Sequence, residues 1–208
     1  MTRRRLDAEL VRRGLVSSRE QGRAAIEGGR VSISGVTATK AATQVDDAAA
    51  IELVAEPGSD FVSRGAHKLI GALDAFGLDV RDANALDAGA STGGFTQVLL
   101  QRGARHVIAV DVGYGQLAWS LRSDDRVTVL ERTNVRHLDA SRDELPFPPD
   151  LVVADLSFIS LTAVLPALVT VAAPTANLVL MVKPQFEVGK ERVGSGVVTS
   201  PDLRREAV

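Results

Sequence analysis

The sequence contains no cysteine and only three histidines, His67, His106 and His137. The absence of cysteine excludes disulfides, thiolate catalysis and cysteine-ligated metals. The three histidines show no spacing typical of a metal site, so we expect no bound metal. The arginine-rich N-terminus has no apolar run behind it, so we expect no signal peptide and a cytoplasmic protein.

Long apolar runs are also scarce, and only one stretch has a length typical of a membrane span. This stretch covers residues 156–174, carries Pro166 near its middle and has Asp155 at its edge. We interpret it as a crossover helix buried in a globular fold. A segment that associates with a membrane is the alternative.

The formal net charge is only −2, so the overall charge does not indicate a nucleic-acid-binding protein. The distribution of charge is uneven, however. Residues 1–40 hold nine Lys and Arg against four Asp and Glu, whereas the rest of the chain holds fifteen against twenty-two. A basic N-terminal segment followed by an acidic remainder indicates a separate module with a polyanionic partner. A merely solvated pair of charged helices is the alternative.

The first fifty residues read as a small α+β module. Ser17 and Ser18 each precede a Glu or Gln by three residues, which is the spacing of a capping box. Gly28-Gly29 predicts a helix end, and alternating apolar and polar residues then predict short strands. The expected elements are helices at 6–13 and 19–27 and strands at 31–36 and 51–54.

A pattern over residues 6–53 resembles the αL RNA-binding motif found in a small-subunit ribosomal protein, many pseudouridine synthases and tyrosyl-tRNA synthetases. It comprises the run Leu10-Val11-Arg12-Arg13-Gly14-Leu15 followed by Ser18, Arg19, Ala24, Ile26, Gly28, Val31 and Gly35. The resemblance implies that basic helix faces hold structured RNA by its backbone and shape. By position, the implied phosphate contacts are Arg4, Arg12, Arg13, Arg19 and Arg23.

Beyond this module the sequence alternates strand and helix patterns, which predicts a doubly wound parallel sheet of the Rossmann-like α/β class. We therefore divide the chain into an RNA-binding domain at 1–56, a linker at 57–63 and a catalytic domain at 64–208. Expected strands lie near 84–88, 107–111, 127–130, 151–155 and 177–182, and expected helices near 66–76, 93–102, 115–122, 160–171 and from 201.

The loop after the first of these strands predicts an adenosine-containing ligand. An acid, Asp87, directly precedes a glycine-rich turn, and a helical pattern follows. The turn lacks the G-x-G-x-x-G order of dinucleotide folds and is similar to the S-adenosylmethionine loop of class I methyltransferases. In that loop Asp87 would assist at the methionine ammonium. The other candidate cofactor-binding residues of the turn are Gly89, Ser91, Gly93, Gly94 and Phe95.

Four further positions are candidates because they lie at the ends of expected strands. Asp111 follows Gly89 by twenty-two residues, where a carboxylate can accept ribose hydroxyls. Asn134 stands where contacts to the adenine edge are expected. Asp155 and Lys183 each end an apolar run, where burial of a charge is costly without a purpose.

Five motifs in order resemble the TlyA family, which pairs an αL domain with an FtsJ-like ribose methyltransferase domain. They are Ser63–Leu69, Asp87–Phe95, Asp111–Leu117, Ala154–Ser160 and Lys183–Glu187. The resemblance implies S-adenosylmethionine as methyl donor, ribosomal RNA or ribosomal subunits as partner, and a catalytic tetrad of lysine, aspartate, lysine and glutamate. The first three members match Lys68, Asp155 and Lys183, with Lys183 as the base that takes the 2′-hydroxyl proton.

The fourth member of the tetrad, expected on a later strand, has no counterpart in the sequence. Ser200-Pro201-Asp202 predicts a strong helix start, yet only seven residues follow Pro201. We therefore expect a catalytic domain incomplete at its C-terminus, with five of the usual seven strands and weak stability or activity.

The leading hypothesis is an rRNA ribose 2′-O-methyltransferase. The family resemblance also includes proteins known as hemolysins, so a membrane-active hemolysin is a second hypothesis. A third is an RNA-binding protein whose methyltransferase fold is vestigial. A nicotinamide oxidoreductase is disfavoured because its glycine pattern is absent.

Overall fold

The computed structural model describes residues 3–13, 15–16, 18–46, 49–54, 61–141, 145–193 and 197–208. Gly14, which belongs to the run that resembles the αL motif, and Ser17, one of the two predicted capping serines, lie outside the described residues, as does the expected linker up to residue 60.

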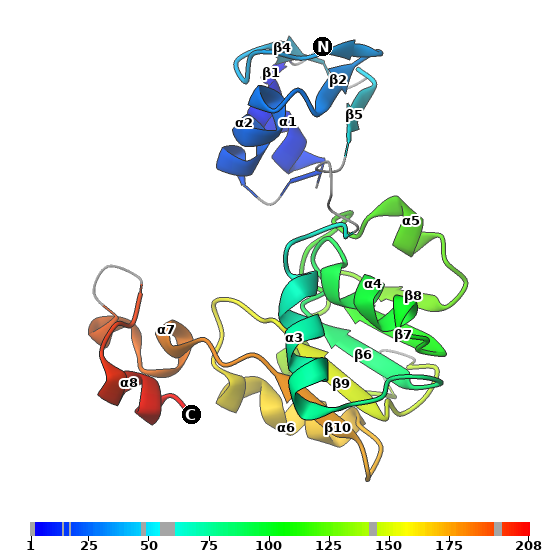
Figure 1. Ribbon diagram of the computed structural model, residues 1–208, viewed down its shortest axis with the longest axis vertical. Coiled ribbons are helices and arrows are strands. Elements are labelled where there is room, and N and C mark those ends of the chain that lie inside the picture. Colours follow the sequence, from blue (N-terminus) through cyan, green and yellow to red (C-terminus); the bar gives the residue numbers. More distant parts are fainter. Residues whose placement is uncertain are drawn as a thin grey trace.

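In its described residues, the N-terminal module has two helices and two small antiparallel sheets (Figure 1). One sheet pairs β1 with β4, and the other has the order β3-β2-β5. Ser18 caps α2 by accepting a hydrogen bond from the Gln21 backbone N–H, as the sequence predicts. The elements are β1 (Arg4–Arg5), α1 (Leu6–Arg12), α2 (Arg19–Glu27), β2 (Val31–Ile33), β3 (Val36–Thr37), β4 (Gln44–Val45) and β5 (Ile51–Leu53).

Among the residues described from 61 onwards, five parallel strands form the sheet of the larger domain, in the order β10-β9-β6-β7-β8. The α/β class and the doubly wound topology predicted from the sequence are confirmed. The strands are β6 (Asn84–Ala88), β7 (His106–Val110), β8 (Val127–Leu130), β9 (Leu151–Ala154) and β10 (Asn177–Leu180). The helices are α3 (Ala66–Phe76), α4 (Gly94–Gln101), α5 (Trp119–Arg122), η1 (Val135–His137), α6 (Leu161–Val171), α7 (Pro184–Glu187), η2 (Lys190–Arg192) and α8 (Pro201–Glu206).

Two apolar layers cover the two faces of this sheet, as the alternation of side chains along a strand requires. On one face Ala85 packs with Leu69 and Leu73 of α3 and with α4. On the other face Leu86 packs with Leu168 of α6 and with η1. Figure 1 shows α3 and α4 together over the sheet, with α6 beside β10. Asp87 therefore points to the same side as Ala85, beneath α4.

Two expectations need correction. The helix expected at 115–122 forms only as α5, because Gly115 has a left-handed φ of 67° and Ala118, the residue before α5, has an extended ψ of 139°. The stretch 156–174 contains the crossover helix α6, but that helix is not wholly buried, since Val169 is 56% exposed. In the part of the chain that the structure describes, no helix has the length and apolarity needed to span a bilayer.

Candidate active site

The turn between β6 and α4 has the backbone that its glycines predict. Gly89 and Gly93 have φ values of 86° and 99°, and even Ser91 lies in the left-handed region at 49°. A Cβ at Gly93 would collide with Leu121 and Leu117, and one at Gly94 would collide with Ser63. The turn is therefore closed against α5 on one side and against the residues before α3 on the other.

We expect Gly93→Ala to lower the free energy of unfolding by roughly 3 kcal/mol, because it adds both backbone strain and overlap with Leu121. Gly71→Ala is the matched control. Gly71 lies inside α3 with open space where a methyl group would stand, so alanine should be neutral or slightly stabilising there. Urea unfolding of both variants measures the difference. Equal effects would show that the turn is not tightly packed.

Asp87, the acid that begins this turn, is 1% exposed. Its Oδ2 accepts a hydrogen bond from Thr96 Oγ1 at 2.7 Å, while its Oδ1 is buried with no hydrogen-bond partner among the described residues. Burial raises the pKa of the Asp87 carboxyl to about 7, against the lowering effect of Thr96. A buried acceptor left open in this way is suited to a cationic or hydrogen-bond-donating ligand.

Asp111 follows β7 and fixes the neighbouring loops through its carboxylate. Oδ2 accepts the Ser91 N–H at 2.8 Å, and Oδ1 accepts the Gly113 N–H at 2.7 Å. Each carboxylate oxygen has further lone-pair capacity for a ligand hydroxyl. A pocket lies beside Asp111 and is lined by polar and apolar residues at the ends of β6, β7 and β8. Its lining residues are Ala90, Ser91, Ala109, Asp111, Gly113, Gln116, Leu117, Val129 and Glu131.

Asn134 does not line this pocket. Its side-chain oxygen accepts the Arg136 N–H at 3.0 Å and caps η1. The polar residue that reaches the pocket from the end of β8 is Glu131, which accepts the Gly115 N–H at 2.7 Å and pairs with Arg122. The sequence signal for Glu131 is an acid directly after an apolar strand, the same signal that identified Asp111.

The three residues matched to the tetrad lie together. Asp155 follows β9, Lys183 follows β10, and Lys68 lies in the first turn of α3. Lys68 Nζ donates to Asp155 Oδ2 at 2.8 Å, and Lys183 Nζ lies 2.6 Å from Asp155 Oδ1 as an ion pair. Lys68 and Asp155, 87 positions apart in the sequence, are thus in contact, and the Asp155 carboxylate joins the two lysines.

This cluster is partly shielded from water. The Lys183 side chain is 17% exposed and that of Asp155 is 18% exposed. Burial alone would raise the pKa of the Asp155 carboxyl, but hydrogen bonds and charge from Lys183 and Lys68 outweigh it and hold this pKa below its ordinary value. Lys183 also donates to Ser157 Oγ at 2.8 Å, a partner that the sequence alone did not identify.

Asp87, Asp111, Asp155 and Lys183 all stand at the carboxyl ends of parallel strands. Ligands bind at this edge in open α/β sheets. The backbone of the turn contacts the cluster directly, since the Asp155 carbonyl oxygen would be 3.2 Å from a Cβ at Gly89. The glycine turn and the lysine–aspartate–lysine cluster therefore form one continuous site. No group of three His, Asp or Glu within the described ranges is arranged to hold a metal.

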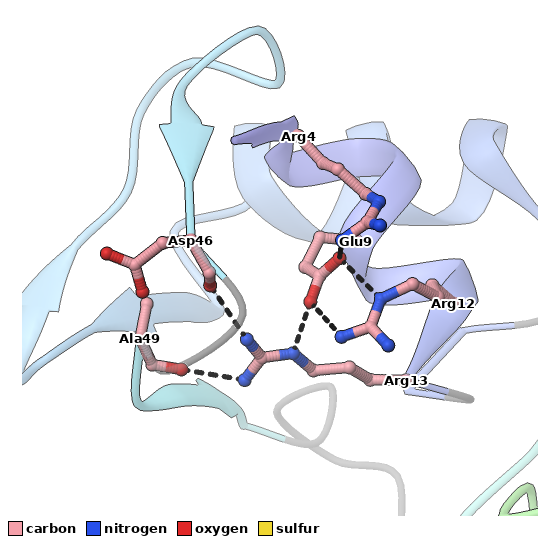
Figure 2. A network of polar contacts seen from close by, with 6 residues as sticks. All are labelled: Arg4, Glu9, Arg12, Arg13, Asp46 and Ala49. Atoms are coloured by element: carbon pink, nitrogen blue, oxygen red, sulfur yellow. Dashed lines mark hydrogen bonds and ion pairs between the residues drawn. The ribbon is translucent and has the colours of Figure 1, made fainter. Parts of the chain in front are cut away.

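In the N-terminal module, four of the five predicted arginines are engaged with buried acids. Figure 2 shows Arg12 and Arg13 converging on Glu9 from α1, with Arg4 nearby. Arg13 also donates to the carbonyl oxygens of Ala49 and Asp46, at 2.7 and 3.2 Å, so its fork ties α1 to the segment before β5. Arg19 donates to Asp7, and Arg23 is exposed on α2.

Each of the two parts of the chain matches a known protein family. Residues 61–208 match the FtsJ-like methyltransferase family, and residues 4–51 match the S4 domain. The 16S/23S rRNA (cytidine-2′-O)-methyltransferase TlyA of Mycobacterium tuberculosis is 59% identical over 99% of this chain and 76% of its own length. Hemolysin A of Brachyspira hyodysenteriae is 37% identical over 98% of this chain and 84% of its own.

A solved structure shares the whole architecture. A candidate hemolysin from Streptococcus thermophilus aligns with a TM-score of 0.72 and 40% identity, over 100% of this chain and 75% of that one. The alignment extends through both the small module and the sheet domain. The chain therefore belongs to the TlyA family, in which an S4 domain precedes an FtsJ-like methyltransferase domain.

Proposed function

We propose that this protein transfers a methyl group from S-adenosylmethionine to a ribose 2′-hydroxyl of ribosomal RNA, with cytidine as the nucleoside. The observation that carries the proposal is the cluster of Lys68, Asp155 and Lys183 beside the glycine turn. The Mycobacterium tuberculosis relative acts on cytidine 2′-oxygens of 16S and 23S rRNA, which supports the same acceptor here.

The described residues fit the methyl donor. The open, buried Oδ1 of Asp87 can accept from the methionine ammonium directly or through water. Asp111 can accept ribose hydroxyls, and Leu117 and Val129 offer apolar surface beside it for the adenosine. When bound, S-adenosylmethionine supplies an electrophilic methyl carbon on a positively charged sulfur.

The cluster of Lys68, Asp155 and Lys183 can supply the base and the positioning that methyl transfer to a ribose hydroxyl requires. A 2′-hydroxyl is a weak acid and a poor nucleophile, so transfer requires a base and strict alignment with the methyl carbon. In its neutral form, Lys183 Nζ takes the hydroxyl proton as the new O–C bond forms and the S–C bond breaks. Asp155 holds Lys183 Nζ at 2.6 Å, as an ion pair while Lys183 is protonated and as a hydrogen bond once Lys183 has lost its proton, and Lys68 completes the neutralisation of Asp155 and binds the ribose.

Tritium transfer from labelled S-adenosylmethionine onto each ribosomal subunit, and onto naked rRNA, tests this function. We expect label in the RNA. Normal RNA binding without S-adenosylmethionine binding by calorimetry would instead indicate a vestigial methyltransferase fold. Dye release from liposomes that survives Lys183→Ala would indicate a membrane-active hemolysin.

The S4 domain is proposed to bind rRNA through phosphates. We expect Arg19→Met to lower RNA affinity and to reduce the slope of log Kd against log salt by roughly one, because one phosphate contact is lost. Arg105→Met serves as control, since Arg105 precedes β7 in the sheet domain, far from the S4 domain in the sequence. An unchanged slope for Arg19→Met would exclude Arg19 from the RNA contacts.

A further inference from the structure

Two acids lie at the centre of the most basic part of the chain. Asp7 and Glu9, both on α1, are each 0% exposed, although the rest of this module's core is apolar. Burying a carboxylate is costly unless charged partners surround it. An apolar residue could fill either position, so stability alone does not account for acids there.

Asp7 joins two arginines that come from separate elements. Its Oδ1 and Oδ2 accept from Nε and Nη2 of Arg5, both at 3.0 Å, in a two-bond fork. Its Oδ2 also accepts from Arg19 Nη2 at 2.9 Å, and its Oδ1 accepts the Ala8 N–H. The end of β1 and the start of α2 thus meet at one carboxylate.

Glu9 does the same further along α1. It accepts two bonds from Arg12, at 2.7 and 2.6 Å, and one from Arg13 at 2.7 Å, with Arg4 at 4.0 Å (Figure 2). Hydrogen bonds from Arg5 lower the pKa of Asp7 to about 2, and those from Arg12 lower the pKa of Glu9 to about 2. Both acids therefore stay ionised at any pH at which RNA is handled.

The arginines on these acids still face water to different degrees. The side chains of Arg5, Arg12 and Arg19 are 41%, 47% and 57% exposed, whereas that of Arg13 is 22% exposed. A long arginine side chain normally samples many rotamers, and binding must restrict them. A carboxylate beneath the guanidinium restricts them before RNA arrives.

We propose that Asp7 and Glu9 are positioning residues that hold Arg5, Arg12 and Arg19 in a fixed array for the phosphates of structured RNA. The inference rests on the proposed rRNA binding of this module. It adds Arg5 to the RNA-facing set and assigns Arg13 chiefly to the structure of the module. RNA backbone phosphates have a regular spacing, so an array fixed in advance is matched to shape rather than to base sequence.

Removing one negative charge tests the proposal, because electrostatics and positioning predict opposite changes in RNA affinity. Asp7→Asn removes a negative charge from an RNA-binding surface, so long-range electrostatics alone predicts tighter binding. Positioning predicts the opposite, an affinity for rRNA that falls by roughly tenfold. Glu27→Gln is the matched control, because Glu27 is an exposed acid at the end of α2 in the same module. It should leave affinity unchanged or slightly raised.

Binding is measured with the full chain and purified rRNA, and circular dichroism checks folding. Equal or tighter binding by folded Asp7→Asn would overturn the proposal. Absence of rRNA binding by the unmodified chain would instead refute the proposed function. Glu9→Gln repeats the test at the second acid.

A measurement on the unmodified chain covers the case in which both variants unfold. Nitrogen-15 relaxation of the arginine Nε–H groups should show Arg5 and Arg12 as rigid as the backbone, because each Nε donates to a buried carboxylate. Order parameters typical of freely rotating side chains would contradict the positioning role. Arg23 on α2 provides the internal reference for an exposed arginine.

Discussion

Lys183→Ala is expected to slow methyl transfer by about 10²- to 10⁴-fold, the range typical for loss of a general base. Lys183 Nζ is the amine that follows β10 beside the glycine turn, and its 2.6 Å ion pair with Asp155 fixes where it lies. Alanine removes both the proton acceptor and one of the two lysine partners of Asp155. Single-turnover transfer from labelled S-adenosylmethionine onto rRNA measures the loss.

Two controls separate this loss from a failure to bind. S-adenosylmethionine and rRNA affinities of Lys183→Ala should change little, because the contacts assigned to the donor lie at Asp87 and Asp111. Lys68→Ala should have a smaller effect on the rate, since Lys68 is half exposed and leaves Lys183 in place. A Lys183→Ala enzyme with near-normal single-turnover rates would remove Lys183 as the base.

Asp87→Asn is expected to stabilise the free protein at pH 8 while weakening S-adenosylmethionine binding. Burial raises the pKa of Asp87 to about 7 from an ordinary value of 3.8. At pH values between these two, the Asp87 carboxyl is protonated in the folded state and ionised in the unfolded state. Stability from this group is complete below about pH 4 and is lost as the pH rises through 7. The difference amounts to roughly 4 kcal/mol at pH 8.

Asparagine can still accept the Thr96 hydrogen bond but carries no charge to be buried. The variant should therefore lose the fall in stability between pH 4 and 8, whereas its affinity for the donor should drop by roughly tenfold or more. Thermal unfolding across this pH range and calorimetric titration measure the two effects. Asp202→Asn, at an exposed carboxylate on α8, should change neither. A destabilised Asp87→Asn protein at pH 8 would contradict the account of a costly buried charge.

The strands and helices of the sheet domain could be predicted because local signals agree with the fold. β7, β8 and β9 are mostly apolar runs directly followed by an acid, and β6 and β8 have the predicted bounds. The helix expected at 115–122 is too long because a pattern does not reveal that Gly115 takes a left-handed φ and Ala118 an extended conformation. That segment instead forms a loop held to Glu131.

The identity of the site residues could be predicted better than their partners. Strand ends placed Asp87, Asp111, Asp155 and Lys183 at one edge, since parallel strands share their direction. The bond from Lys183 to Ser157 depends on how two loops approach, which sequence spacing does not encode. The same holds for Asp7 and Glu9, whose burial among arginines arises only when β1, α1 and α2 pack together.

Lys68, Asp155 and Lys183 are proposed to direct a methyl group from the donor at the Asp87 turn to a ribose oxygen. Digestion of the methylated rRNA to nucleosides, followed by mass spectrometry, tests this proposal most directly. We expect the added methyl group on the sugar fragment, as 2′-O-methylcytidine. A methyl group on the base fragment would contradict the assignment of this cluster to a ribose hydroxyl.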